Sequence, residues 1–375
     1  MSVAAAMLQS DPAQDHRFMA LAFTLGRRGL GNTWPNPAVG AVIVKDGIVI
    51  GRGWTQPGGR PHAETVALKR AGKTANGATL YVTLEPCSHH GKTKPCTDAI
   101  VAAKIARVVS ALEDPNPEVA GQGHARLTAR GITVEIGLGA EEARRAHAGH
   151  LRRMRDSRPQ VMLKLAVSAD GKAGLAGRKP AAITGERARA RVQLLRAQSD
   201  AILVGIGTVL SDDPALTCRL PGMERRSPVR VVLDARLRVP LATAVIATAR
   251  DTPTWVFAAP KASTMAEEVL RTKGVEVFRV KAKQGKLDLA RVLKVLAERG
   301  ITRLMVEGGP TVAASFVEAG LVDEVALFRS PTEIGPDGIN ALEGRKLDSL
   351  TKSRQLRSLG SEMLGADKLE LYERA

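Results

Sequence analysis

The stretch that most constrains this chain begins at His62-Ala63-Glu64 and ends at Cys96. A histidine, a glutamate two residues later and the distant cysteines Cys87 and Cys96 form the pattern of a zinc deaminase, in which His/Cys/Cys bind the metal and the glutamate does not. Three protein ligands leave one coordination position open, as a catalytic zinc requires. The pattern therefore predicts a hydrolytic zinc site in which Glu64 transfers protons.

The residues around this pattern predict alternating strands and helices. Residues 39–44 and 78–84 read as buried strands, whereas the apolar spacing after Pro61 and after Cys96 predicts helices. A thiol at a helix N-terminus ionises more readily, and zinc binds the thiolate. The sequence thus places the ligands at strand ends and helix starts.

Other interpretations of the same residues remain open at this point. A lone His-x-Glu, or a pair of buried cysteines, is common without any metal. A structural zinc would need a fourth ligand, for which His89 and His90 are the only nearby candidates. The chain has three cysteines and two of them fit the pattern, with Cys218 left over, so we expect a catalytic zinc.

The composition is that of an ordinary globular protein. The chain has 375 residues, of which 44% are hydrophobic and 25% charged, enough for two domains with their own cores. It contains no apolar run of membrane-spanning length, no signal-peptide pattern and too few cysteines for a disulfide framework. We therefore expect a cytoplasmic protein with no membrane partner.

A net charge of +17 raises the question of a nucleic-acid partner. Residues 1–150 carry 17 Lys and Arg against 12 Asp and Glu, so most of the surplus lies outside the predicted zinc site. Aromatic residues make up only 3% of the chain, which is poor for stacking on bases. Anionic small molecules would use the same positive field. We expect phosphorylated small-molecule substrates and no nucleic acid.

The domains are expected at 1–147 and 161–375, joined by a linker over 148–160. The stretch 139–159 is charged, helix-prone and ended by proline, so we expect an interdomain helix and linker, with a basic run that is usually a solvated face. The second domain alternates strands with helices, which favours an α/β sheet.

Two strands of the second domain run into turns that contain glycine, at 205–208 and at 307–311. Glycines after a strand let the backbone approach a phosphate, and the following helix N-terminus favours the anion. Each turn taken alone is as well explained by a tight turn. Two of them in one domain predict a split site for a phosphorylated cofactor.

The run 83–96, together with Asn36-Pro37-Ala38-Val39-Gly40 and His62-Ala63-Glu64, closely resembles the bifunctional deaminase–reductase family of riboflavin biosynthesis. The wide gap between the cysteines is typical of that family, whereas nucleic-acid deaminases usually have Cys-x-x-Cys. The second half is similar to the family's reductase at 164–171, 200–205, 212–217 and 307–309. The resemblance covers nearly the whole chain.

This resemblance implies an α/β protein with an N-terminal cytidine-deaminase-like α/β/α domain and a C-terminal dihydrofolate-reductase-like domain. It implies zinc-dependent deamination of 2,5-diamino-6-ribosylamino-4(3H)-pyrimidinone 5′-phosphate, followed by NADPH-dependent reduction of the ribosyl side chain to ribityl. The cofactors would be one Zn²⁺ per chain and NADPH. We also expect a homo-oligomer, either a dimer or a tetramer.

The resemblance also assigns residues. His62, Cys87 and Cys96 would hold zinc, and Glu64 would be catalytic. The cofactor-binding positions would be Ala166, Thr208, Asp212, Asp234, Gly309, Pro310 and Thr311, and the substrate-binding positions Asn36, Arg196, Leu216, Arg219 and Glu307. Lys164 and Asp212 are candidates for polar assistance in the reduction, in which the cofactor supplies the reactivity. Many family members have Ser-x-Trp where this chain has Pro180-Ala181-Ala182, so those contacts are absent or supplied elsewhere.

Two rival functions remain in view. The basic charge would suit a deaminase that edits bases in nucleic acid, which would show salt-sensitive affinity for RNA. Alternatively, the second domain could be a scaffold fused to a deaminase, without a reaction of its own.

Overall fold

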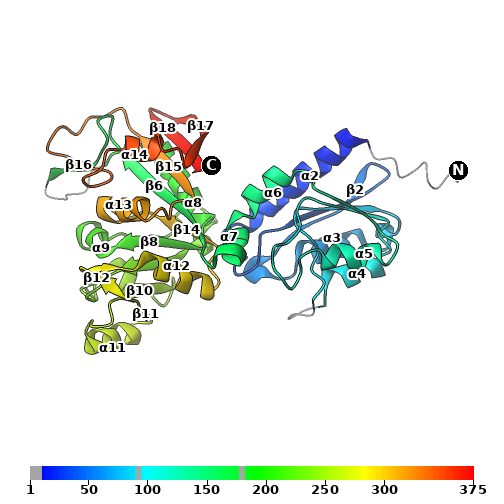
Figure 1. Ribbon diagram of the computed structural model, residues 1–375, viewed down its shortest axis with the longest axis horizontal. Helices are drawn as coiled ribbons and strands as arrows, with labels where there is room; N and C mark the ends of the chain where they lie inside the picture. The colour runs from blue at the N-terminus through cyan, green and yellow to red at the C-terminus, as the bar shows by residue number, and fades with distance from the viewer. Residues whose placement is uncertain (1–10, 90–93, 177–181) are drawn as a thin grey trace. The chain divides into compact units, whose positions relative to one another are not determined.

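The computed structural model describes residues 11–89, 94–176 and 182–375. The chain divides into two compact units, Met1–Ser157 and Arg158–Ala375, each with its own sheet (Figure 1). Within the described ranges, no helix is both long enough and apolar enough to cross a membrane.

The first unit is built on a five-stranded sheet in the order β2-β1-β3-β4-β5. β1 pairs antiparallel with β2 and β3, while β3, β4 and β5 run parallel. The strands are β1 Gly40–Lys45, β2 Ile48–Trp54, β3 Thr79–Val82, β4 Arg107–Ser110 and β5 Thr133–Ile136. The helices are α2 Pro12–Gly26, η1 Arg27–Gly29, η2 Pro57–Gly59, α3 Ala63–Ala71, η3 Gly72–Ala75, α4 Cys96–Ala102, α5 Gln122–Thr128, α6 Ala140–Ala146 and α7 Ala148–Asp156.

Helices cover both faces of this sheet because successive strand residues point to opposite sides. On one face Ile43 and its neighbours pack against α3, α4 and α5. On the other face Val42 and its neighbours pack against α2 and α6. Both residues are fully buried. The result is the α/β/α arrangement that the sequence predicts.

The second unit contains a nine-stranded sheet in the order β11-β10-β9-β8-β14-β6-β15-β18-β17. The first seven strands in this order run parallel, and β18 and β17 complete the sheet as an antiparallel pair. The strands are β6 Gln160–Val167, β8 Ala201–Gly205, β9 Val229–Leu233, β10 Thr254–Ala258, β11 Glu276–Arg279, β14 Arg303–Val306, β15 Glu324–Arg329, β17 Leu356–Leu364 and β18 Asp367–Arg374. Two small ribbons pair β7 Lys172–Gly174 with β16 Ile339–Asn340, and β12 Ala282–Lys283 with β13 Lys286–Leu287.

Helices also pack on the second sheet. They are α8 Glu186–Ala197, α9 Ile206–Asp212, η5 Glu224–Arg226, α10 Ala244–Ala247, α11 Thr264–Thr272, α12 Leu289–Glu298, α13 Pro310–Glu318 and α14 Asp348–Thr351. α9, α10 and α11 share one core with β8, β9 and β10. α8 packs with β14, β15 and β18 in another. Parallel strands end at one edge of a sheet, and binding residues gather at that edge.

The segment 148–160, for which the sequence predicts a helix and linker, contains a helix and a short connection. Residues 148–156 form α7 and belong to the first compact unit, while β6 already begins at Gln160. Only residues 157–159 lie between these two elements. α7 is bonded to the first unit through His150 and Asp114.

Candidate active sites

His62, Cys87 and Cys96 come together in the first unit. His62 is the residue before α3, Cys87 follows β3, and Cys96 begins α4. His62 Nδ1 lies 3.4 Å from Cys96 Sγ and 3.6 Å from Cys87 Sγ. All three potential ligand atoms lie within 4.8 Å of one another. One imidazole nitrogen and two sulfurs at this spacing suit a zinc ion.

The start of α4 prepares the two thiols for a metal. The backbone N–H of Cys96 donates to Cys87 Sγ at 3.3 Å. The hydrogen bond from the Cys96 side chain lowers the pKa of Cys87 to about 4, and the same bond, together with burial, raises the pKa of Cys96. Zinc binds cysteine as the thiolate, so metal binding at this position would favour ionisation of both thiols.

Glu64 lies in the first turn of α3, two residues after His62. Its side chain is buried, and it lines a cavity of about 150 Å³ together with His62 and Cys87. Burial raises the pKa of Glu64 above the ordinary value of a carboxyl group. A carboxyl group with a raised pKa takes up and releases protons more readily near neutral pH.

Two glycines of β2 determine how closely α3 lies on the sheet. A Cβ on Gly53 would stand 2.3 Å from the carbonyl oxygen of Ala63, and one on Gly51 would stand 2.4 Å from that of Ala67. Any larger residue at either position would push the helix away from the strand. The glycines therefore fix the start of α3, and with it His62 and Glu64, against the sheet.

Asn36 lies beside the same histidine. Its Nδ2 donates to the carbonyl oxygen of Gly59 at 2.9 Å and lies 3.3 Å from His62 Nε2. Asn36 also lines the cavity, as does His89. His89 does not join the ligand group within the described residues, and His90 lies outside them.

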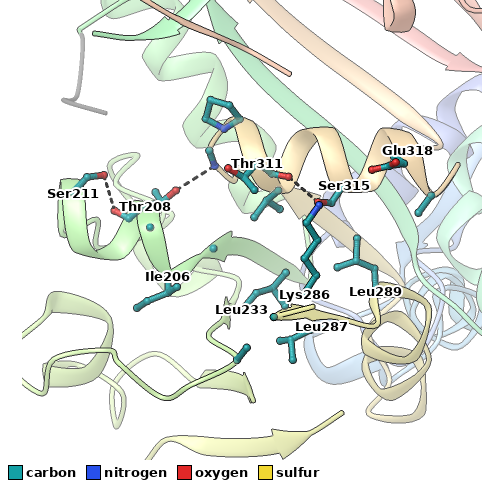
Figure 2. Close-up of a pocket in the computed structure, with 18 of the residues that line it drawn as sticks. Ile206, Thr208, Ser211, Leu233, Lys286, Leu287, Leu289, Thr311, Ser315 and Glu318 are labelled. Atoms are coloured by element: carbon teal, nitrogen blue, oxygen red, sulfur yellow. Dashed lines mark hydrogen bonds between the residues drawn. The ribbon is translucent and has the colours of Figure 1, made fainter. Parts of the chain in front are cut away.

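The second unit contains a larger cavity, of about 690 Å³, which is in the size range of cofactor sites. Of the residues predicted to bind the cofactor, it is lined by Thr208, Asp212, Gly309, Pro310 and Thr311. Figure 2 shows α9 with Thr208 and Ser211 on one side, α13 with Thr311 and Ser315 on another, and Lys286 extending towards α13. The backbone N–H of Gly309 donates to Thr208 Oγ1 at 3.2 Å, so the two glycine turns meet at this cavity.

The glycines of these turns serve two different purposes. A Cβ on Gly205 would lie 2.8 Å from the side chain of Val312, and one on Gly308 would lie 2.7 Å from it. Gly205 and Gly308 thus allow α13 to pack closely on the ends of β8 and β14. A Cβ on Gly207 would meet nothing within 4 Å, and Gly207 lines the cavity. Packing explains why Gly205 and Gly308 are glycines, whereas the open space beside Gly207 leaves room for a ligand.

A partly buried ion-pair cluster joins Lys164 of β6, Arg196 of α8 and Glu307, the residue after β14. Lys164 Nζ lies 3.1 Å from Glu307 Oε1, and Arg196 donates to Glu307 Oε2 at 2.9 and 3.0 Å. Burial opposes ionisation of Glu307, but the two cations hold its pKa below the ordinary value. The three residues therefore form one charged group, although none of them lines the cavity described above.

The other predicted reductase residues do not line this cavity. Ala166 packs against the core of α8, and Leu216 is buried in the core that contains α9. Asp234 is fully buried, and its carboxylate accepts the backbone N–H groups of Arg238 and Val239. Arg219 is exposed. Asp234 therefore shapes the turn after β9, and that turn brings Ala235 and Arg238 into the cavity.

Comparison with known proteins assigns each half of the chain. Residues 12–112 match the cytidine and deoxycytidylate deaminase zinc-binding region, and residues 159–368 match the RibD C-terminal domain. The riboflavin biosynthesis protein RibD of Escherichia coli is 42% identical over 367 residues, covering 94% of this chain and 98% of its own length. That of Aquifex aeolicus is 41% identical over 360 residues, covering 96% and 98%.

The chain belongs to the RibD family. Solved structures support the same family assignment. One crystal form of Acinetobacter baumannii RibD matches 97% of this chain and all of its own, with a TM-score of 0.86 and 36% identity. A Thermotoga maritima diaminohydroxyphosphoribosylaminopyrimidine deaminase/5-amino-6-(5-phosphoribosylamino)uracil reductase matches 97% of this chain and 99% of its own, with a TM-score of 0.84 and 34% identity.

Membership in the RibD family confirms the predicted fold and its two activities. The chain is a bifunctional enzyme of riboflavin biosynthesis, with a zinc-binding deaminase domain and a reductase domain. The fold is mixed α/β, with a cytidine-deaminase-like domain first and a dihydrofolate-reductase-like domain second. The roles of single residues in this RibD chain remain predictions.

Several residues of the RibD cavities were not foreseen from the sequence. Around the zinc ligands they are Thr55, Arg60, Asp114, Asn116, His150, Arg153 and Met154. Around the larger cavity they include residues 286–290, Arg238, Ser315 and Glu318. The spacing of His150 and Arg153, three residues apart on a helix, was a usable signal because such residues share one helix face.

Proposed function

We propose that the first unit deaminates 2,5-diamino-6-ribosylamino-4(3H)-pyrimidinone 5′-phosphate with one zinc ion, and that the second reduces the product's ribosyl group with NADPH. The observation that carries this proposal is the convergence of His62, Cys87 and Cys96 beside the buried Glu64 in one cavity. The name of the Thermotoga relative supports the same substrate class.

The residues of the first unit would have different roles in the hydrolysis. His62, Cys87 and Cys96 would hold the zinc ion, which supplies Lewis acidity that makes water nucleophilic near neutral pH. Glu64 would accept a proton from the attacking water and give it to the ring nitrogen, and would then take the proton of the newly added hydroxyl group and pass it to the departing amine. Asn36, which lines the cavity beside His62, would hold the heterocycle.

The residues of the second unit bind and orient. NADPH supplies the hydride. Thr208, Asp212 and residues 309–311 would hold the cofactor in the cavity, where Arg238 and Lys286 add positive charge suited to its phosphates. Ala166 and Asp234 would contribute from the strand ends, Asp234 by shaping the adjoining turn.

The sugar phosphate of the reductase substrate would lie near the charged cluster of Lys164, Arg196 and Glu307. Glu307 and Arg196 would bind the substrate directly, whereas Leu216, with its side chain in the core, would offer only its backbone. Arg219, which is exposed, would pair with the phosphate. Lys164 donates one hydrogen bond to Glu307. Because its ammonium group has three N–H donors, another of them would donate to the sugar oxygen and assist the reduction.

Two further features complete the proposal. The chain would act as a homo-oligomer in the cytoplasm, either a dimer or a tetramer, on small molecules and without nucleic acid. The edge strand β17 supports self-association because it exposes Leu359 and Met363.

The test uses the purified full-length protein. We expect it to contain zinc, to release ammonia from the diaminopyrimidine phosphate, and to oxidise NADPH only when the deaminated intermediate is present. Ammonia release without NADPH oxidation would refute the reductase assignment and favour a scaffold. Tight, salt-sensitive binding of tRNA without turnover of the small molecule would refute both assignments.

A further inference from the structure

Glu85 is a buried carboxylate that neither the zinc motif nor the reaction uses. It lies after β3, its side chain is fully buried, and it lines the deaminase cavity. Its one ion-pair partner among the described residues is His124, whose Nδ1 lies 3.8 Å from Glu85 Oε1. Burial lowers the pKa of His124, so the imidazole is uncharged at neutral pH and does not balance the carboxylate. Because a buried charge needs partners, other groups must stabilise it.

Four backbone N–H groups stabilise this carboxylate, and all of them come from residues 114–124. Oε2 accepts the N–H of Asp114 at 3.1 Å and that of Gly121 at 3.0 Å. Oε1 accepts the N–H of Gly123 at 2.8 Å and that of His124 at 3.3 Å. Each oxygen therefore receives two N–H groups, and hydrogen bonds to an ionised acceptor are stronger than neutral ones.

The same carboxylate takes the place of a missing helix cap. The N-cap residue of α5 is Gly121, which has no side chain to accept a hydrogen bond. The first N–H groups of a helix have no partner inside the helix, and a side chain at the N-cap usually accepts from one of them. Glu85 accepts two of them, from Gly123 and His124. It thus connects α5 to the chain segment that follows β3.

These bonds argue against a second metal centre at Glu85. Glu85, Glu113 and His124 offer ligand atoms within 4.8 Å of one another, which is close enough for a cation. Both oxygens of Glu85, however, already face two N–H groups each, and the positive ends of those groups would repel a cation. The carboxylate is therefore a link within the protein.

The linked segment forms part of the wall of the deaminase cavity. Asp114, Asn116 and Val119 line this cavity together with His62 and Glu64. The three wall residues lie in the loop between β4 and α5, which contains no helix or strand. The backbone groups of such a loop must find partners outside regular secondary structure. The bonds to the buried carboxylate are among those that hold the loop in place.

Close packing brings α5 against the backbone around Cys87. A Cβ on Gly123 would stand 2.1 Å from the carbonyl oxygen of Pro86, so a larger residue would push α5 away. Arg126, on the same helix, donates to the carbonyl oxygen of Ser88 at 3.0 Å. The start of α5 therefore follows the position of the segment that contains Cys87.

Cys87 itself is held from another side, by α4. The N–H of Thr97 donates to the carbonyl oxygen of Cys87 at 3.2 Å, and the N–H of Cys96 donates to its Sγ at 3.3 Å. None of these bonds involves the side chain of Glu85. A change of that side chain would therefore move the cavity wall and leave the proposed zinc ligands in place.

We propose that Glu85 is a positioning residue of the deaminase, whose carboxylate fixes residues 114–124 and the cavity wall they form relative to the proposed zinc ligands. Both of its oxygens are occupied by N–H groups, so it acts through the wall and not by contact with the reacting atoms. A misplacement of about 1 Å can cost about 100-fold in rate. The inference rests on the proposed function and adds a residue on which substrate binding depends.

The decisive variant is Glu85→Gln in the full-length protein, because glutamine keeps the size of the side chain and replaces one oxygen with an NH₂ group. Two backbone N–H groups then face another donor, so residues 114–124 shift. We expect KM for the diaminopyrimidine phosphate to rise about 10- to 100-fold and kcat to change by less than about 3-fold. Zinc content should not change. Reduction of the deaminated intermediate, which takes place in the second unit, should not change either.

Two companion variants separate positioning from a general loss of stability. Leu127→Ala removes a fully buried side chain from α5 and touches none of the bonds to Glu85. It should lower the melting temperature of the first unit and leave KM unchanged well below that temperature. Gly123→Ala keeps the carboxylate but pushes α5 away from Pro86, so it should raise KM as Glu85→Gln does.

An unchanged KM in Glu85→Gln would overturn the inference, and so would a loss of zinc from that variant. An equal rise of KM in Leu127→Ala would show a merely structural role and would overturn it too. If Glu85→Gln folds poorly, Gly123→Ala decides, and an unchanged KM there would overturn the inference. Failure of the unsubstituted protein to release ammonia would instead refute the proposed function, so the two failures are distinguishable.

Discussion

Glu64 is buried next to a histidine and two cysteines that suit a zinc ion, and its carboxyl group has a raised pKa. No other carboxylate of the cavity is free for proton transfer in the same way, among the residues that the structure describes. Glu85 is bonded to backbone N–H groups and Asp114 to His150. We therefore propose that proton transfer in the deaminase depends on this single residue.

Glu64→Gln keeps the size of the side chain but removes its capacity to carry a proton. We expect deamination to fall by about 10²- to 10⁴-fold, the usual contribution of general acid–base catalysis. Zinc content should not change, because Glu64 is not a ligand. Ammonia release and elemental analysis measure the two effects, with reduction of the deaminated intermediate as an internal control. Deamination within a few-fold of the original rate would rule out this role for Glu64.

Single residues differ in how well the sequence predicts them. His62, Cys87, Cys96 and Glu64 are recognisable because the metal chemistry restricts both residue type and spacing. Arg153 was included in a charged run that is usually a solvated face, and only the contact between His150 and Asp114 shows which face of α7 points inward. Leu216 and Asp234 match substrate- and cofactor-binding positions of the family. The side chain of Leu216, however, packs in the core, and that of Asp234 accepts hydrogen bonds from a turn.

At the scale of elements, the close packing of α3 on β2 sets the geometry of the deaminase site. Gly51 and Gly53 let backbone lie against backbone, and His62 and Glu64 are at the end of the helix that results. The strands and helices around the zinc motif could be predicted because they are short, apolar and periodic. The close packing of α3 on β2 could not be predicted from the sequence, because it depends on which strand the helix packs against.

The variant Gly53→Ala tests whether the site needs the close packing of α3 on β2. The added methyl group would lie 2.3 Å from the Ala63 carbonyl oxygen, so the backbone must move, and such overpacking costs about 1–3 kcal/mol. We expect the melting temperature of the first unit to fall by several degrees and its zinc affinity to weaken. Calorimetry and competition with a chelator measure these effects. Gly344→Ala, where an added Cβ meets nothing within 4 Å, is the control. If the melting temperature and zinc affinity of the first unit were unchanged in Gly53→Ala, the close packing of α3 on β2 would not be needed.

At the scale of the whole molecule, the chain consists of two α/β units that each gather chemical groups at strand ends. The alternation of strands and helices predicted this architecture as far as α13. No helix or strand after residue 319 was predicted, yet β15, β17 and β18 lie there and complete the sheet. β17 is exposed along most of its length, so its strand character comes from pairing with β18 and not from an apolar pattern.

The proposed zinc site is itself a property of the folded chain, because its three proposed ligands come from the start of one helix, a position after a strand and the start of another helix. The most direct test is the zinc content of the full-length protein and of two cysteine variants. We predict one zinc ion per chain in the unsubstituted protein, the same in Cys218→Ser, whose cysteine is buried in the second unit, and little or none in Cys96→Ser. An unsubstituted protein that deaminates without zinc, or a Cys96→Ser variant that keeps its full zinc content, would contradict the account.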